Sequence, residues 1–143
     1  MSYLRAISAM PLLLVFLSCS ADKPGAIVYQ YLRQTGGDGA RDCGYVRLGE
    51  SATEANHCVE DAYRKRLPFA VRYQVKGLDS QLVVGLAGDG TGRVVSVKYD
   101  SEGWDRSSNE NSSLAENNHL LLTACPTPIQ FHVSQSGYLA CRD

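Results

Sequence analysis

The predicted fold rests on residues 51–100, SATEANHCVEDAYRKRLPFAVRYQVKGLDSQLVVGLAGDGTGRVVSVKYD. The first part has apolar residues at helical spacing and charged residues on the other face, so it predicts an amphipathic helix over about 52–66. Ser51 and Glu54 have the spacing of a capping box, in which the two side chains satisfy free amides of the first helical turn. Pro68 cannot continue the helix and ends it.

Strands are predicted throughout the rest of the chain. Residues 69–76 alternate between apolar and polar, residues 82–87 are almost continuously apolar, and residues 94–99 follow a Gly-rich turn. Further strands are expected at 45–48 and 120–124, and a C-terminal hairpin at 129–133 and 138–141. Residues 26–32 favour a strand by their β-branched and aromatic content, although their apolar residues would also form a helical stripe.

This order of elements predicts the fold class. One helix precedes a run of strands joined by short turns. We therefore expect an α+β fold of two layers, in which one main helix, about 52–66, packs on an antiparallel β-meander sheet. The continuous apolar character of residues 82–87 indicates a central position in that sheet.

The N-terminal segment has the pattern of a secretory signal peptide. Arg5 is its one charged residue, and an apolar run follows over residues 11–17. The run is too short to span a bilayer as a helix, and its flanks differ from those of a transmembrane segment. Residues 1–18 are therefore predicted to be a leader that is removed on export.

The leader ends in Phe16, Leu17, Ser18 and Cys19, which places a cysteine after a small residue. This order resembles the lipobox of bacterial lipoproteins, with Phe16 standing where leucine is commonest and Leu17 where a small residue is commoner. The resemblance implies cleavage before Cys19 and attachment of fatty acyl groups, palmitate among them, to its sulfur and new amino group. Ser20 follows in place of Asp, which by the same resemblance implies sorting to the outer membrane, facing the periplasm. The alternative is an ordinary signal peptide in which Cys19 has no special role.

The mature chain is expected to form one domain. Residues 19–25 are polar and contain a Pro-Gly pair, so they predict a lipidated N-terminus with a short tether. Residues 26–143 are long enough for a single disulfide-stapled domain and too short for two. Loss of Arg5 with the leader changes the formal net charge from −1 to −2. With this mildly acidic balance and no basic run, nucleic acid is excluded as an expected partner.

Four cysteines remain besides Cys19, namely Cys43, Cys58, Cys125 and Cys141. An even number of cysteines in an exported chain indicates disulfides, because the compartment is oxidising. Three pairings are possible, and the low entropic cost of closing short loops favours Cys43–Cys58 with Cys125–Cys141. The alternative of a zinc or redox site has little support, because no Cys-x-x-Cys spacing is present.

Two features are candidates for functional chemistry. His57 and Asp61 are four residues apart on the predicted helix and would share one face, with Glu54 nearby. They could act as an acid–base pair or as part of a metal site, although a solvated helix face with a favourable charge contact is the simpler interpretation. Trp104, the single tryptophan, stands in a polar stretch; it would either cap the core or contact a partner.

The sequence therefore predicts a small envelope lipoprotein without cofactor. Because no recognisable catalytic motif is present, we expect a non-catalytic module that binds another envelope protein, as an assembly accessory or an inhibitor. The membrane would hold it through the lipid on Cys19. The alternative is a small envelope hydrolase or metal-dependent enzyme that uses His57 and Asp61.

Overall fold

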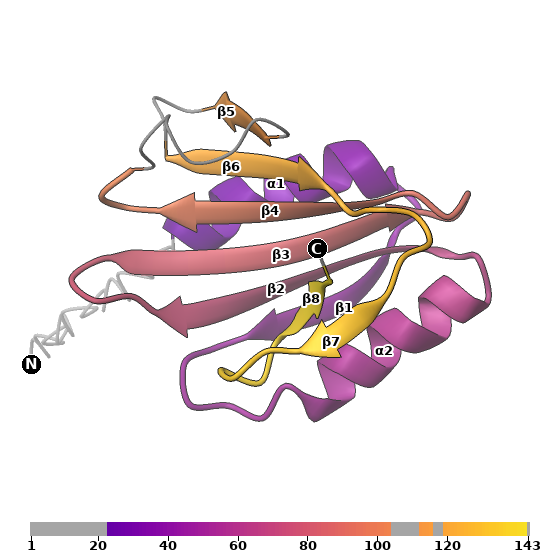
Figure 1. Cartoon of the computed structure of the whole chain (residues 1–143), viewed down its shortest axis with the longest axis horizontal. Helices are drawn as coiled ribbons and strands as arrows, with labels where there is room; N and C mark the ends of the chain where they lie inside the picture. Colours follow the sequence, from indigo (N-terminus) through magenta and orange to yellow (C-terminus); the bar gives the residue numbers. More distant parts are fainter. Residues whose placement is uncertain (1–22, 104–111, 116–118, 143) are drawn as a thin grey trace, which may run out of the picture.

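A computed structural model of the chain describes residues 23–103, 112–115 and 119–142. The elements in chain order are α1 (Lys23–Gly36), β1 (Arg41–Val46), α2 (Thr53–Arg64), β2 (Pro68–Lys76), β3 (Gln81–Asp89), β4 (Val94–Asp100), β5 (Ser112–Ala115), β6 (Leu120–Ala124), β7 (Phe131–Val133) and β8 (Leu139–Cys141) (Figure 1).

Six of the strands form one mixed sheet in the order β1-β2-β3-β4-β6-β5. β1 and β2 are parallel, and α2 supplies the crossover connection that a parallel pair requires. All other neighbours in this sheet are antiparallel. β7 and β8 form a separate antiparallel hairpin that lies in front of the sheet in Figure 1.

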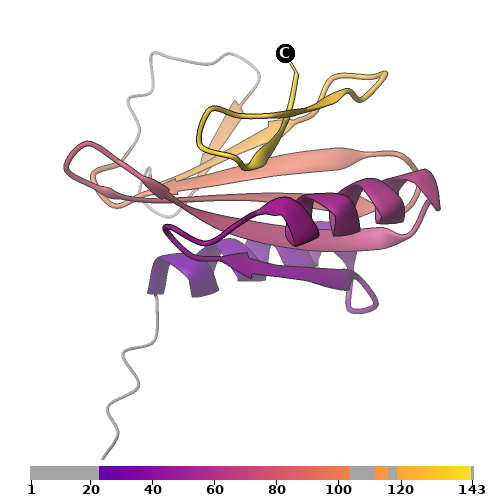
Figure 2. The ribbon, with the colours of Figure 1, turned by 90° about the horizontal axis from the view of Figure 1, so that it is seen from below.

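The sheet is covered on both faces (Figure 2). On one face, α1 buries Val28 and Leu32 against a set of apolar strand residues, Ala70, Val83, Ala87, Val97 and Leu120. On the other face, α2 and the β7–β8 hairpin pack over a second cluster that includes Phe69, Val71, Tyr73, Val84 and Leu86. The molecule therefore has three layers, with a core on each side of the sheet.

The predicted two-layer fold, with one main helix on an antiparallel meander, is wrong in three respects. The segment favoured as a strand is part of α1, the first strand pairs parallel with β2, and the C-terminal hairpin lies outside the main sheet. The first of these errors has a clear physical reason. β-branched residues favour strands only weakly, and burial of the helical stripe against the sheet outweighs that preference.

Gly85 on β3 makes room for α1. A Cβ at this position would lie 2.7 Å from Cδ1 of Leu32, 3.0 Å from Cγ1 of Val28 and 2.9 Å from the carbonyl oxygen of Val71. The helix therefore approaches the sheet at a point where no side chain larger than hydrogen fits. This close approach allows α1 to bury Val28 and Leu32 against the sheet and so to form the core on that face.

The central elements match their predictions. The predicted helix is α2, which spans Thr53–Arg64, and the strands predicted at 69–76, 82–87 and 94–99 are β2, β3 and β4. The capping box is wrong, because the N-cap is Ala52 and no side chain caps the helix. The Ser51 hydroxyl instead lies 3.1 Å from that of Thr53.

The prediction of disulfide bonds is confirmed. Cys43 is bonded to Cys58, and Cys125 is bonded to Cys141. The first disulfide joins edge strand β1 to α2. The second joins the residue after β6 to β8, so it attaches the hairpin to the sheet.

Candidate functional site: a groove between α2 and the C-terminal hairpin

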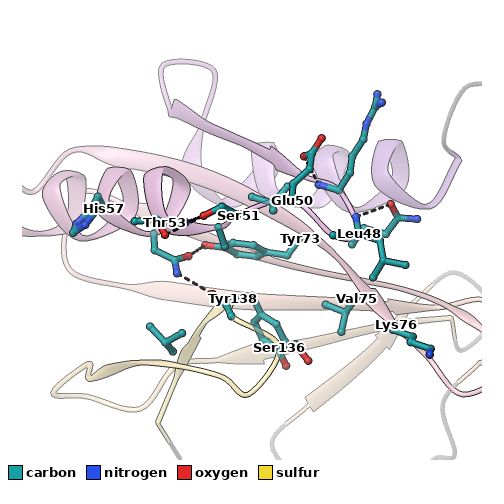
Figure 3. Close-up of a pocket in the computed structure, with 18 of the residues that line it drawn as sticks. Leu48, Glu50, Ser51, Thr53, His57, Tyr73, Val75, Lys76, Ser136 and Tyr138 are labelled. Atoms are coloured by element: carbon teal, nitrogen blue, oxygen red, sulfur yellow. Dashed lines mark hydrogen bonds between the residues drawn. The ribbon is translucent and has the colours of Figure 1, made fainter.

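A groove with a volume of about 540 Å³ opens on the face that carries α2 (Figure 3). Four segments that are distant in sequence form it: the β1–α2 loop, the first turns of α2, the C-terminal half of β2 and the turn of the β7–β8 hairpin. The groove exists because the hairpin folds back over the sheet beside α2 instead of joining the sheet as further strands.

Tyr73 on β2 connects the walls of this groove. Its hydroxyl donates to Oδ1 of Asn56 on α2 at 2.8 Å, and Nδ2 of Asn56 donates to the carbonyl oxygen of Gly137 in the hairpin at 3.0 Å. Burial raises the pKa of Tyr73, and a hydrogen bond with the backbone of Leu139 offsets this only partly. The side chain is therefore neutral at ordinary pH and acts here as a structural donor.

Part of the groove lining is apolar and aromatic. The rings of Tyr73 and Tyr138 lie 5.9 Å apart, centre to centre, and Val75 continues the surface along β2. At the edge of the groove, Leu48 is 58% exposed and Val133 is 59% exposed. Aliphatic side chains that remain this open to water gain free energy when another molecule covers them.

The β1–α2 loop that borders the groove is held by its own hydrogen bonds. The Glu50 carboxylate accepts from the backbone amide of Arg47 at 2.8 Å, and the Glu50 amide donates to the Arg47 carbonyl at 3.0 Å. Oε1 of Gln74 on β2 accepts from the Leu48 amide at 3.4 Å. These contacts hold the backbone of Leu48 in a defined position.

Both disulfides support the groove from outside. Cys58 lies on α2, and its bond to Cys43 fixes that wall to the edge of the sheet. Cys141 ends β8, and its bond to Cys125 fixes the opposite wall. The four bonded cysteines therefore act on the geometry of the groove as well as on the stability of the domain.

His57 and Asp61, considered as an alternative acid–base or metal-binding pair, each contact other residues. Nδ1 of His57 lies 3.8 Å from the carboxylate of Glu60, and the His57 side chain is largely exposed. Asp61 instead contacts Lys65 at 2.9 Å and Arg41 at 3.3 Å, and these hydrogen bonds to cations lower its pKa. Asp61 is thus an acceptor in a surface ion-pair network that joins α2 to β1.

A metal site would need further ligands near these residues. Across residues 23–103, 112–115 and 119–142, no three His, Cys, Asp or Glu side chains gather closely enough to hold a metal ion. Of the other predicted site residues, Cys19 and Trp104 lie outside the described residues.

The residues that build the groove were missed by sequence reasoning. The sequence places Tyr73 only in the alternating pattern of the strand over residues 69–76, and it gives Asn56 no functional role. Their hydrogen bonds join positions separated by 17 and 81 residues, so no local pattern reveals them. One available signal was the polar Asn56 on the otherwise apolar inner face of the predicted helix.

Neither helix in the part of the chain that the structure describes is long and apolar enough to cross a membrane. No protein family model matches the chain, and no curated protein or solved structure is significantly similar to it.

Proposed function

We propose that this protein is a small bacterial envelope lipoprotein that binds another envelope protein in the groove between α2 and the β7–β8 hairpin. A lipid on Cys19 holds it at the outer membrane, facing the periplasm. It acts without catalysis, as an assembly accessory or an inhibitor of its partner. The leader sequence supports the proposed localisation, and the groove supports the proposed binding function.

The observation that supports binding most strongly is the composition of the groove. Aromatic residues dominate the energetics of protein interfaces, and here the half-buried ring of Tyr138 lines the groove together with the exposed aliphatic residues Leu48 and Val133. The polar groups at the centre, Asn56 and the Tyr73 hydroxyl, already bind each other. The lining also carries Glu50, Glu60 and Lys76, so a bound protein segment would combine apolar side chains with polar contacts.

The exposed edge favours a protein over a small molecule. A small ligand could fill the volume of the groove and would still leave Val133 in contact with water. A protein segment extends beyond the cavity and covers such residues, as the rim of an interface usually does. The proposed partner is accordingly a segment of an envelope protein with apolar side chains.

Site-specific photo-crosslinking in intact cells tests this proposal. A photoreactive amino acid replaces Val133 at the groove, and in a control chain it replaces Gln30, which is exposed on α1 across the sheet. We expect a defined crosslinked protein from position 133 only. The Tyr138→Ala variant removes part of the groove lining and should abolish the product. Equal products from both positions, or no product from position 133, would contradict the proposal.

A further inference from the structure

One end of the molecule gathers the start of α1 and three connecting segments. The chain enters α1 at Lys23 at the left of Figures 1 and 2, where the β1–α2 loop, the β2–β3 turn and the turn of the β7–β8 hairpin also lie. The Arg72 guanidinium, in the middle of β2, donates to the carbonyl of Gly25, whereas Gly36 at the other end of α1 lies near Phe69, so α1 runs along β2 with its start directed toward this end of the molecule. We call this the anchor end.

Exposed apolar side chains concentrate at the anchor end. Of the four large hydrophobic residues that are strongly exposed among the described residues, Leu48, Leu78 and Val133 lie there. Leu78, at the tip of the β2–β3 turn, is fully exposed. The fourth, Leu67, is 44% exposed and follows α2 at the opposite end. Scattered exposed leucines are normal in soluble proteins, but their collection at one end indicates a contact surface.

The short segment between Cys19 and α1 indicates which surface the anchor end contacts. Four residue steps separate Cys19 from Lys23, and a fully extended chain spans at most about 14 Å over that distance. A lipid on Cys19, as proposed above, would therefore hold the anchor end within that distance of the bilayer. No soluble protein domain fits between the two surfaces at so short a separation.

We propose that the anchor end docks on the lipid bilayer, with Leu78 inserted into the interface between headgroups and acyl chains. This proposal rests on the lipid anchor, and it adds a fixed orientation to the anchored domain. Leucine at the end of a turn is well suited to shallow insertion, because its side chain enters the apolar boundary while the backbone stays among the headgroups.

The charges beside these leucines indicate that apolar contact, not headgroup charge, drives docking. The loop around Leu48 contains Arg47 and Glu50, and the turn around Leu78 is bordered by Lys76 and Asp79. Each segment thus carries one cation and one anion. Without a basic cluster, the surface gains little from anionic lipid, so docking should hardly depend on the fraction of anionic lipid.

This orientation also restricts the partner. The groove is bordered by the β1–α2 loop and by Lys76, so it opens beside the anchor end. If that end lies on the bilayer, the groove faces the space just above the headgroups. The segment that it binds then belongs to a membrane-embedded protein or to one held at the same surface.

Tryptophan fluorescence in vesicles tests the docking. The mature lipidated protein is prepared with Leu78→Trp in a Trp104→Phe background, which leaves one tryptophan, and is reconstituted into vesicles that contain brominated phospholipid. The matched control carries Leu67→Trp in the same background. We expect bromine to quench the emission of the Leu78→Trp protein and to leave that of the Leu67→Trp protein nearly unchanged, in neutral and in anionic vesicles alike.

The outcomes separate this inference from the lipoprotein proposal. Equal quenching at both positions, or none at position 78, overturns docking of this end, even when mass spectrometry shows the lipid on Cys19; the exposed leucines would then be left for a protein partner. If the purified chain carries no lipid, the proposed anchor is wrong. The same two variants are then mixed with vesicles, and absence of selective quenching at position 78 again overturns the docking.

Discussion

At the scale of single residues, Tyr73 has the most consequential position in the structure. It is one of the largest fully buried side chains, and its hydroxyl begins the hydrogen-bond chain through Asn56 to the hairpin. A buried polar group is costly when its partner is removed, so the chain favours one arrangement of α2, β2 and the hairpin. The groove depends on that arrangement.

Tyr73→Phe removes the hydroxyl and leaves Oδ1 of Asn56 without its donor. We expect the free energy of unfolding at neutral pH to fall by about 1 kcal/mol, the usual cost of such a loss. Urea denaturation measures the change. Tyr63→Phe is the matched control, because the contact of Tyr63 with Phe131 is made by the ring, and it should cost clearly less. Equal losses in the two variants would show that the hydrogen-bond chain adds no stability.

The same residue predicts a loss of stability in alkali. Tyr73 has a raised pKa in the folded protein, whereas an unfolded tyrosine ionises near pH 10. Above about pH 10 the unfolded state loses a proton that the folded state keeps, so the free energy of unfolding falls as pH rises. The Tyr73→Phe protein lacks this contribution and should show a shallower decline from pH 9 to 11. Parallel pH profiles for the two proteins would contradict the assignment.

At the scale of elements, the sequence predicted the helices and strands whose own pattern of apolar residues identifies them. The amphipathic stripe of α2 and the alternation along β2 both persist over enough residues to identify their elements. Residues 26–32 favour a strand in the sequence but lie in α1. Their stripe of Val28 and Leu32 can pack on the sheet only because Gly85, more than fifty positions later, leaves room for it. Parallel pairing of β1 with β2 likewise depends on the path of α2 across the sheet.

The candidate site was predicted less well than the fold, for the same reason. His57 and Asp61 drew attention through their spacing, but His57 lies beside Glu60 and Asp61 pairs with Lys65, so the two residues do not act together. The groove brings together segments from four parts of the chain, and only the folded hairpin places Gly137 beside Asn56. A local window can show that Asn56 is a polar residue on an apolar helix face, but it cannot show which distant residue it contacts.

Gly85→Ala tests the packing of α1 on the sheet. The added methyl would meet Leu32 and the Val71 carbonyl at less than 3 Å, so the helix must shift. We expect a loss of about 1–3 kcal/mol in the free energy of unfolding, as for other overpacked cores. Gly39→Ala is the control, since a Cβ there meets no atom within 4 Å, and it should change stability little. A neutral effect of Gly85→Ala would show that α1 is not closely packed at this point.

At the scale of the whole molecule, three properties meet at the anchor end: the start of α1, the exposed leucines and the opening of the groove. The lipid proposed on Cys19 would place all three at the bilayer surface. The ion-pair network around Asp61 lies away from this surface and serves the stability of the domain. Localisation and binding would thus be combined in one small chain.

The lipid on Cys19 is the central claim, because the localisation, the class of partner and the orientation on the bilayer all depend on it. Its most direct test is the intact mass of the protein from the membrane fraction, measured before and after reduction. We expect the mass of residues 19–143 plus three acyl chains, with a gain of two hydrogens for each disulfide on reduction. An unacylated chain, or one cleaved at another position, would contradict the account.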